Sequence, residues 1–574
     1  MAITTEEDIT TTSPNDWKYV SEGGATIVFS YVGPLPPTPQ SPSGQSSCRV
    51  RNQAFEGMVL RLRKVPSVPL GVRFGSDSSS NSSDSSGSSE DIEVEEDDED
   101  EPDDPSIAFQ RQCMTRLVPK AHLPRLESIS VRSPPGRMYR GGEVLEHGQG
   151  GEEGGEGLLG YETRNSQNNS AGGDIVDEHG DHDQRPHHHH HSHRDHSNDG
   201  SAWLRALATT HEESRPPARR ALGGVDFKRK KGVLATDLVG GQGMSVEIKP
   251  KWSFLPNTEH LSAETKPVKT NTCRFCMHSH MRIQGLSAAD GAQIQNHESG
   301  GISARGYCPL DLFSPDPERV RRAVYTLYDA WIASEGKANN LKMFVRGKGV
   351  KVHERKLIFA DPPSNIEDDQ IRRALADGLL PLLIRTPVLQ LLNRLQRSLD
   401  MLDIEGLAKV WEKWCRVSSS GTEEGDGTLP PIGTNCEEPT LGEWGSFIDR
   451  YLRELGLPEG SGEGPARLER RKVAELPEID TKEEMRYYLL AYLLSATFKD
   501  CSIIVRIPLL GSLDGGSDQR VGEDLEVDPT ITMIDLDPKS MKRLRKWELL
   551  DREIANIYGM LGEKERKVCV DDWR

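Results

Sequence analysis

The sequence predicts an α+β fold in two lobes with long disordered insertions, and three observations lead to this prediction. Strand patterns dominate the first part of the chain, helix patterns dominate the second, and strand patterns return near the end. Only 35% of the 574 residues are hydrophobic, and the chain contains 54 glycines and 36 prolines. Much of its length is therefore expected to lie outside any packed core.

The first, β-rich lobe is expected to span residues 14–237, after a loose tail at residues 1–13. The segment 25–33 (ATIVFSYVG) alternates and is rich in β-branched residues, which is typical of a strand. The segment 57–64 (GMVLRLRK) has the same character. Both lie among glycines and prolines that mark the turns of a β-rich region.

Two insertions interrupt this lobe, at about 76–105 and 133–201. The first passes from a Ser-rich tract into an acidic tract, and residues 90–104 contain twelve acidic residues and no basic one. The second is rich in Gly, Asp and His and includes five consecutive histidines from His187 to His191. Neither composition can bury enough apolar surface to offset the entropy lost on ordering. Residues 107–131, between the insertions, look foldable.

The second lobe is expected to span residues 238–574. A strand is predicted at 245–251, and helices are predicted to open at Ser314-Pro315, at Thr386-Pro387 and at the capping box Thr481-x-x-Glu484. The first of these helices carries its apolar face at Val320, Val324, Leu327, Tyr328 and Trp331. Apolar runs at 501–510 and 530–537 predict the strands that close the lobe.

The totals also limit where the protein acts and what it binds. The sequence contains no run of 18 apolar residues, so we expect no membrane span. The acidic, polar N-terminal region does not resemble a signal peptide. An odd count of nine cysteines suits a reducing compartment, so we expect the cytoplasm or the nucleus. The run KRKK (228–231) fits a nuclear import signal or a plain basic loop equally well. A net charge of -19 argues against nonspecific nucleic-acid binding, and we expect a monomer.

The residues with chemical potential fit the requirements of phosphoryl transfer. This reaction needs a flexible turn and cations at the phosphates, carboxylates for magnesium, and a group that orients or deprotonates the attacking hydroxyl. The turn Ser21–Thr26 (SEGGAT) suits the first role, with a plain hairpin turn as the alternative. Arg61 on the strand 57–64 suits the second, with a solvated strand face as the alternative.

Lysines and aspartates supply the remaining parts. Lys249 and Lys251 are two apart in an extended segment, so both side chains are expected on one side, where they suit a polyanion. Asp500 directly precedes one apolar strand, and Asp535 and Asp537 end another. Carboxylates at strand ends commonly serve as metal ligands or bases, although turn-capping aspartates have the same spacing.

Several strings in this sequence together resemble the inositol-pentakisphosphate 2-kinase family, in the family's order. The longest, SVEIKPKWSFLP (245–256), is close to the family's EIKPK-x-GFLP segment, and SEGGAT resembles its glycine-rich GEGAAN-type start. The others are CRFCMH (273–278), YCPLDLFS (307–314), KANNLKMF (337–344), MLDIEG (401–406), KDCSIIV (499–505) and IDLDPK (534–539). The matches span about 17–64 and 237–550, and the insertions suggest a fungal-type member.

The resemblance implies a two-lobed fold distantly similar to protein kinases. It also implies transfer of the γ-phosphate of ATP, with Mg²⁺, to the 2-hydroxyl of inositol 1,3,4,5,6-pentakisphosphate, which gives the hexakisphosphate (phytate). By motif, Asp500 is implied as the base and Lys249 as a further catalytic residue, while Asp535 and Asp537 are the implied magnesium ligands. The implied nucleotide contacts are Glu22, Gly23, Gly24, Arg61, Asp237 and Asp535. The implied contacts to substrate phosphates are Lys249, Lys251, Arg274, Asn339, Asn340, Lys342, Lys539 and Arg543.

The sequence departs from the family pattern at a few positions. Lys342 stands where some members have Arg, which removes a bidentate grip on phosphate. Cys276 stands where at least one plant member has a lysine. His278 is followed by Ser rather than Gln, and Tyr307 by Cys308 rather than Asp. None of these changes removes a catalytic carboxylate.

Three other readings remain open from the residues. The run Cys273-x-x-Cys276-x-His278-x-His280 has spacing that suits zinc, although no second ligand pair lies nearby in the sequence. A kinase fold that has lost catalysis and binds inositol phosphates as a scaffold is the main functional alternative. A protein kinase is disfavoured because the chain lacks an HRD-type catalytic loop and the DFG and APE strings.

Overall fold

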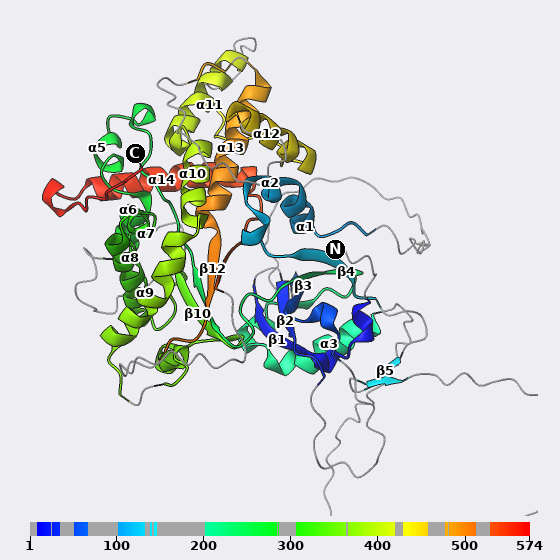
Figure 1. Cartoon of the computed structure of the whole chain (residues 1–574). Coiled ribbons are helices and arrows are strands. Elements are labelled where there is room, and N and C mark those ends of the chain that lie inside the picture. The colour runs from blue at the N-terminus through cyan, green and yellow to red at the C-terminus, as the bar shows by residue number, and fades with distance from the viewer. Residues whose placement is uncertain are drawn as a thin grey trace, which may run out of the picture.

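The structure is a computed structural model, shown in Figure 1. It describes residues 8–23, 26–34, 51–66, 101–132, 138–140, 143–145, 201–283, 285, 306–362, 365–419, 429–456, 477–479, 481–511 and 529–573. The structural statements below concern these residues.

Thirteen strands form three antiparallel sheets within the described ranges. They are β1 Trp17–Glu22, β2 Thr26–Tyr31, β3 Met58–Pro66, β4 Leu126–Ser130, β5 Met138–Arg140, β6 Glu143–Leu145, β7 Gly223–Val225, β8 Lys231–Thr236, β9 Met244–Ile248, β10 Leu341–Val345, β11 Lys348–Gly349, β12 Ser502–Ile507 and β13 Thr530–Ile534. A six-stranded sheet has the order β1-β2-β3-β8-β4, with β7 paired to β3. A five-stranded sheet has the order β11-β10-β9-β12-β13, and β5 pairs with β6.

The helices lie mostly in the second half of the chain. They are α1 Pro105–Phe109, α2 Thr115–Leu117, α3 Ala202–His211, α4 Pro217–Arg220, α5 Lys266–Lys269, α6 Arg274–Ile283, α7 Pro309–Leu312, α8 Pro317–Ala333, α9 Asp368–Arg385, α10 Val388–Leu399, α11 Asp403–Ser419, α12 Leu441–Glu454, α13 Lys482–Asp500 and α14 Leu544–Gly559. A π-helical turn, η4 Gln110–Met114, joins α1 to α2. The mixture of sheets and helices confirms the predicted α+β class.

The six-stranded sheet has its own apolar core. Alternation along β2 buries Ile27 and Phe29 on one face, and Leu60 of β3 packs in the same cluster. Trp203 of α3 closes this core edge-on against Trp17, with ring centroids 6.5 Å apart. The strands predicted at 25–33 and 57–64 are therefore confirmed as β2 and β3.

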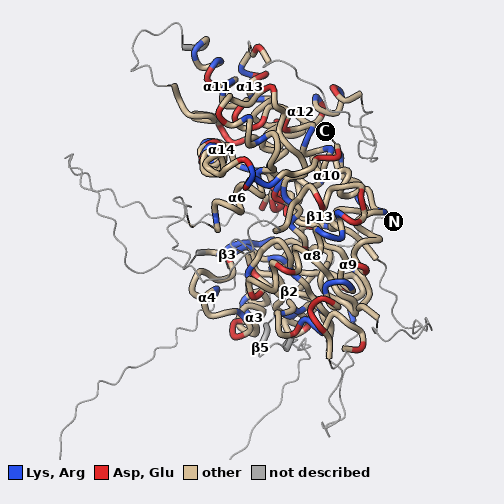
Figure 2. The backbone as a smooth tube through the Cα atoms, turned by 90° about the vertical axis from the view of Figure 1, so that its left-hand side faces the viewer, with Lys and Arg blue, Asp and Glu red and all other residues tan. Residues whose placement is uncertain are grey.

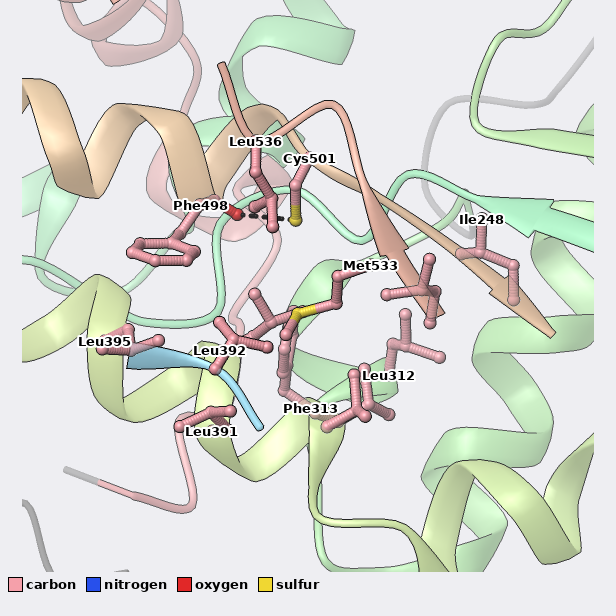
Figure 3. Packing of buried hydrophobic residues seen from close by; sticks show 14 of the residues in the cluster. Ile248, Leu312, Phe313, Leu391, Leu392, Leu395, Phe498, Cys501, Met533 and Leu536 are labelled. Atoms are coloured by element: carbon pink, nitrogen blue, oxygen red, sulfur yellow. Dashed lines mark hydrogen bonds between the residues drawn. The ribbon is translucent and has the colours of Figure 1, made fainter. Parts of the chain in front are cut away.

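The five-stranded sheet organises the larger core. All five residues of β9 are buried, as expected for a strand with a neighbour on each side. Helices α8 and α9 lie beside β10 and β12, and α10 packs against α13 (Figure 1). Figure 3 shows Leu392 and Leu395 of α10 among Met533 of β13 and Phe498 of α13. The strands predicted at 245–251, 501–510 and 530–537 correspond to β9, β12 and β13.

Two of the predicted helix starts need adjustment and one is confirmed. The helix expected to open at Ser314 begins at Pro317, because Asp316 caps it by accepting from the Glu318 amide at 3.0 Å. The expected apolar face of this helix is buried. The helix expected at Thr386-Pro387 begins one residue later, at Val388. At α13 the Thr481 hydroxyl accepts from the Glu484 amide at 3.1 Å, as predicted.

The predicted boundaries of both insertions are too wide. Residues 101–105 are ordered because their carboxylates have partners: Glu101 accepts from the Lys230 amide at 2.6 Å, and Asp104 pairs with Arg63 at 2.7 Å. Asp104 also caps α1. Within the second insertion the short strands β5 and β6 form a hairpin, and Ser201 is buried. The loose tail predicted at residues 1–13 is also too long, because residues 9–11 form a 3-10 turn and Ile9 is buried in the core of the six-stranded sheet. Residues 1–7, 76–100 and 146–200 lie outside the described residues.

Among the described residues, no single helix has the length and apolar character needed to cross a membrane. One bent pair, Asp368–Arg385 and Val388–Val417, meets the length and composition criteria only when its two parts, which meet at 60°, are joined.

A buried ion network connects α5 to α11 and α14. The Lys269 ammonium, 1% exposed as a whole residue, lies 2.5 Å from Asp403 Oδ1 and 2.8 Å from Asp551 Oδ2. Burial lowers the pKa of Lys269, but the two carboxylates outweigh burial, so the net pKa is raised and the lysine stays charged. Asp551 in turn accepts from Arg274 of α6 at 2.9 Å.

Replacing Lys269 by Met is expected to destabilise the chain by about 3–5 kcal/mol, because the buried Asp403 loses its ion-pair partner and Asp551 keeps only Arg274. The midpoint of urea unfolding measures the effect. Lys266→Met on the same helix is the matched control, since Lys266 is exposed. Equal midpoints for the two variants would show that the network adds nothing to stability.

Candidate active site

A cavity rich in basic residues, here called the cationic cavity, lies between α6, α13 and the segment that follows β13. Its volume is about 270 Å³. It is lined by Lys251, Trp252, Arg274, Phe275, His278, Arg282, Asn339, Asn340, Tyr492, Ala496, Lys499, Asp500, Lys539, Arg543, Trp547 and Leu550. Six of these are Lys or Arg and one is Asp, although the whole chain is acidic. Figure 2 shows Lys and Arg positions in blue beside α6 and α14.

Asp500 stands between two lysines of this cavity. Its carboxylate oxygens lie 3.1 Å from Lys251 Nζ and 3.2 Å from Lys539 Nζ. Burial raises the pKa of Asp500, but the two ammonium groups outweigh burial and hold its pKa below the usual range. Asp500 is therefore an anion at neutral pH, flanked by two cations that an incoming anion can engage.

A second pair, Lys249 and Asp535, lies next to the first. Lys249 Nζ is 3.1 Å from Asp535 Oδ2, and the Ser502 hydroxyl donates to the same oxygen at 3.1 Å. Ser502 is also paired with Ile534 across β12 and β13, so the residues just before β12 and just after β13 are brought together. Burial lowers the pKa of Lys249. The charge of Asp535, followed by that of Asp500, raises the pKa by more than burial lowers it, so the net pKa lies above its usual value. The predicted base and metal carboxylates thus lie at neighbouring strand ends.

The backbone at both lysine–aspartate pairs takes an unusual conformation. Lys251 has a φ of 67° and Asp535 a φ of 61°, in the left-handed region that non-glycine residues rarely adopt. Lys251 is thus not part of an extended segment with Lys249, contrary to expectation, and the two lysines meet different carboxylates. The Gln396 side chain, fully buried on α10, fixes this arrangement by donating to Lys251 O at 3.1 Å and to Phe498 O at 3.0 Å.

Helix α6 presents a row of basic groups to the cationic cavity. Arg274, His278 and Arg282 are spaced four residues apart and therefore share one face of the helix. Arg274 is held by Asp551 and lies over the Trp252 ring at 4.9 Å. Burial, and then the nearby charges of Arg274, Arg282 and Lys251, lower the pKa of His278 to about 4. The histidine is therefore neutral at pH 7.

Lys499 is a buried cation at the base of the same cavity. It pairs with Asp400 and lies 4.0 Å from the centre of the Trp252 ring. Burial lowers the pKa of Lys499, and the carboxylate of Asp400 offsets only part of this effect. In the sequence, the position of Lys499 directly before Asp500 in the KDCSIIV string indicates that Lys499 lies near the site.

A second cavity of about 280 Å³, here called the inter-sheet cavity, lies between the six-stranded and five-stranded sheets. Its apolar wall includes Val28, Val59, Leu126, Ala235 and Met533. Its polar lining includes Arg61, Asp237, Asp535 and Asp537. Residues of α1 and η4 also line it, so the segment 107–131 contributes to the site and not only to the fold.

Asp237 lies where the chain passes from one sheet to the other. Its carboxylate accepts from the Ser30 hydroxyl at 2.5 Å and from the amides of Val239 and Gly240 at 3.0 and 2.7 Å. These bonds fix the connection between β8 and β9 at the wall of the inter-sheet cavity.

Some of the predicted site residues lie elsewhere. Glu22 is buried in ion pairs with Lys64 at 2.5 Å and Arg215 at 2.9 Å, and it is not among the residues that line the inter-sheet cavity. Gly23 makes the turn after β1, since its amide donates to Thr26 O at 2.9 Å. Gly24 lies outside the described residues. Lys342 pairs with Glu247 at 3.0 Å and is not among the residues that line the cationic cavity.

The four residues of the predicted zinc ligand set do not come together in the structure. Cys273 and Cys276 do converge, but with Cys308 and Cys569. His278 lines the cationic cavity, and the His280 ring stands edge-on to Tyr558 at 5.5 Å. The sequence placed the four residues together because they are close along the chain, whereas α6 turns the histidines away from the thiols.

Several lining residues were missed from the sequence. Arg282 and His278 had a signal, because their four-residue spacing from Arg274 is that of one helix face. Trp252 and Trp547 had no signal beyond their aromatic character. Gln396, which supports the cavity without lining it, had none, because its role depends on the packing of α10 against α13.

Comparison with known proteins agrees with this geometry. The sequence profile of the inositol-pentakisphosphate 2-kinase family matches residues 19–553. An inositol-pentakisphosphate 2-kinase of Cryptococcus neoformans is 30% identical over 362 residues, which cover 61% of this chain and 73% of that protein. Its namesake in Arabidopsis thaliana is 25% identical over 57% of this chain and 62% of that protein.

A shorter match involves an inositol-pentakisphosphate 2-kinase of Danio rerio. It is 39% identical over 103 residues, or 18% of this chain and 17% of that protein. The family profile covers far more than half of the chain, including both lysine–aspartate pairs. This chain therefore belongs to the inositol-pentakisphosphate 2-kinase family and is an inositol phosphate kinase.

Proposed function

We propose that the chain transfers the γ-phosphate of ATP to the 2-hydroxyl of inositol 1,3,4,5,6-pentakisphosphate and so produces inositol hexakisphosphate. The observation that carries this proposal is the cationic cavity, in which six Lys or Arg residues surround one carboxylate. Cations gathered at this density in an acidic chain suit a small ligand with many phosphates. The single carboxylate beside them suits the one hydroxyl that must react.

Asp500 is the proposed base for the 2-hydroxyl proton. In the free protein its two lysine partners stabilise the anion, which makes it a weak base. Phosphates of the substrate that engage Lys251 and Lys539 would reduce this stabilisation and add negative charge nearby. Both effects raise the pKa of Asp500, so the base would strengthen when the substrate is in place.

The inter-sheet cavity is the proposed nucleotide site. Its apolar wall suits a planar base. Arg61 lines the cavity, where its guanidinium would meet phosphate oxygens. Asp535 and Asp537 also line this cavity, and Asp535 pairs with Lys249 at the same place.

Asp535 and Asp537 are the proposed magnesium ligands. The donor set fits, because carboxylate oxygens are preferred by Mg²⁺ and the Asp535 side chain is about half exposed, at 51%. A bound Mg²⁺ would neutralise charge on the phosphates. Lys249, which lines neither cavity, would hold Asp535 in place through its ion pair.

We further propose that the two sheets, with their helices, form the two lobes of a kinase-like fold, with the reaction between them. The positions of the two cavities support this: one lies between the sheets, and the other is built on the five-stranded sheet and its helices. The direct test is to incubate the purified chain with labelled ATP, Mg²⁺ and a panel of inositol phosphates. Identification of the product isomer decides, and phosphate binding without any turnover would favour a scaffold.

Asp500→Asn is expected to lower kcat by about 10²–10⁴-fold, because the amide cannot accept the hydroxyl proton. Binding of the pentakisphosphate, measured by calorimetry, is expected to remain. A variant that turns over at a near-normal rate would remove Asp500 from the role of base.

Lys251→Ala is expected to weaken pentakisphosphate binding by about 1–3 kcal/mol, the value of a charge-assisted hydrogen bond. Lys413→Ala is the control, since Lys413 is an exposed lysine of α11 away from the cavity lining. Equal affinities for the two variants would place Lys251 outside the substrate site.

The pKa of His278 is expected to rise from about 4 when inositol hexakisphosphate binds, because bound phosphates offset the charges of Arg274 and Arg282. Titration of the imidazole signals by NMR measures this, with His278→Gln used for assignment. The exposed His353 serves as an internal reference. A pKa that stays near 4 with ligand bound would place the phosphates away from α6.

A further inference from the structure

The indole of Trp252 contacts two cations at the wall of the cationic cavity. The Lys499 ammonium is 4.0 Å from the centre of its ring, and the Arg274 guanidinium carbon is 4.9 Å from it. The indole also stacks on Phe254, with ring centroids 6.4 Å apart and an interplanar angle of 25°. One aromatic side chain therefore lies between a buried cation and a cation of the proposed substrate site.

The backbone at Lys251 explains why Trp252 reaches this cavity. In an extended segment, consecutive side chains point to opposite sides. Lys251 and Trp252 nevertheless both line the cationic cavity, because the φ of 67° at Lys251 interrupts the extended course of the chain. Gln396 holds the turn by donating to Lys251 O at 3.1 Å and accepting from the Ser253 amide at 2.9 Å.

Core packing does not account for the indole. Within the described part of the chain, Trp252 belongs to none of the clusters that form the hydrophobic cores. Its ring is half-buried, and its closest charged neighbours are the two cations. A role that involves these cations is therefore more consistent with the structure than a role in a core.

Lys499 gives the indole a fixed point of contact. This lysine is buried and pairs with the buried Asp400, and its ammonium also lies 5.0 Å from the centre of the Tyr492 ring. A desolvated ammonium attracts an aromatic face more strongly than an exposed one does. The buried ion pair therefore holds the indole in place.

Arg274 gains a fixed plane from the same ring. Its Nε donates to Asp551 Oδ1 at 2.9 Å, and this bond does not use the two Nη groups, which can donate to a phosphate. A guanidinium bound through one nitrogen can still turn about that bond. Contact with the face of Trp252 restricts this rotation, because a planar guanidinium packs flat on an aromatic ring.

Repulsion within the cavity opposes this placement of Arg274. Burial lowers the pKa of Lys499, and the charge of Arg274 lowers it further, so the two cations repel each other. A long basic side chain under such repulsion tends to extend towards water. The negative face of the indole offsets the repulsion, because it attracts both cations at once.

We propose that Trp252 is a positioning residue that holds the Arg274 guanidinium in the orientation in which it binds a phosphate of the inositol phosphate substrate. Its ring is fixed by Lys499, which is fixed in turn by Asp400. A buried ion pair thereby sets the direction of a cation at the cavity wall. This inference rests on the proposed function, in which Arg274 binds the substrate.

The test is a double-mutant cycle on the full-length chain, with inositol hexakisphosphate as the probe and calorimetry as the measurement. Trp252→Leu is expected to weaken binding about three- to thirtyfold, the range of one partly desolvated cation–π contact. In the Arg274→Gln background the same substitution should weaken binding less than about twofold, because the guanidinium that the ring positions is gone. Equal losses in the two backgrounds would overturn the proposal.

A second substitution keeps the shape of the ring and so does not depend on whether the leucine variant folds. Tryptophan fluorinated on its six-membered ring, inserted at position 252 alone, retains the size of the indole but weakens the negative charge of its face. We expect it to bind hexakisphosphate at least about twofold more weakly than the wild-type chain, with an unchanged midpoint of thermal unfolding. Unchanged binding by the fluorinated chain would overturn the proposal.

The matched control is Trp414→Leu, which removes a half-buried indole of α11 outside the cavity lining and should leave the affinity unchanged. An equal loss in this variant would show that the effect of Trp252→Leu is not specific to the cavity, and would overturn the proposal. A wild-type chain that does not bind hexakisphosphate would overturn the proposed function and this inference with it. Wild-type binding with an additive cycle would overturn this inference alone.

Discussion

The antiparallel pairing of β9 with β12, and of β12 with β13, is the constraint on which the site depends. It aligns Ile503 with Ile248 and Ser502 with Ile534. The last residues of β9 and β13 therefore lie beside the first residues of β12. The residues just beyond those ends are Lys249, Asp500 and Asp535. Because the register is set by buried apolar side chains, a slip of one residue would turn the core faces outward and separate the charges. The stability of the core therefore maintains the geometry of the ionic groups.

Charged side chains form two layers around these strand ends. The outer layer is accessible and consists of Lys251, Asp500 and Lys539, whose ion pairs can be exchanged for ligand phosphates. The inner layer is buried, with Lys269 and Lys499 held by Asp403, Asp551 and Asp400. The carboxylates around Lys269 outweigh the effect of burial on its pKa, whereas Asp400 offsets only part of that effect on the pKa of Lys499. The inner pairs also position Arg274, because Asp551 binds both Lys269 and Arg274.

The sequence predicted well what is decided locally and poorly what depends on distant partners. Periodicity located β2, β3, β9, β12 and β13, and the capping box located α13, because these signals span fewer than ten residues. The reach of the acidic insertion was misjudged, since Asp104 is ordered by Arg63, a residue 41 positions earlier. The role of Glu22 was likewise hidden, because its partner Arg215 is 193 positions away. Half of the thiol cluster was invisible for the same reason: Cys308 and Cys569 are 261 residues apart.

The long reach of these contacts bears on how the chain matures during synthesis. Lys251 and its partner Asp500 are 249 residues apart, and Leu255 bonds to Asp571 across 316 residues. At ribosomal speeds of about 5–20 residues per second, β9 would wait at least ten seconds or so before β12 emerges. The last strand of the six-stranded sheet, β8, ends at Thr236. This sheet can therefore form in the meantime, and its contacts with later segments follow afterwards. Until β10 and β12 emerge, the apolar side chains of β9, all of which become buried, have no sheet neighbours to pack beside.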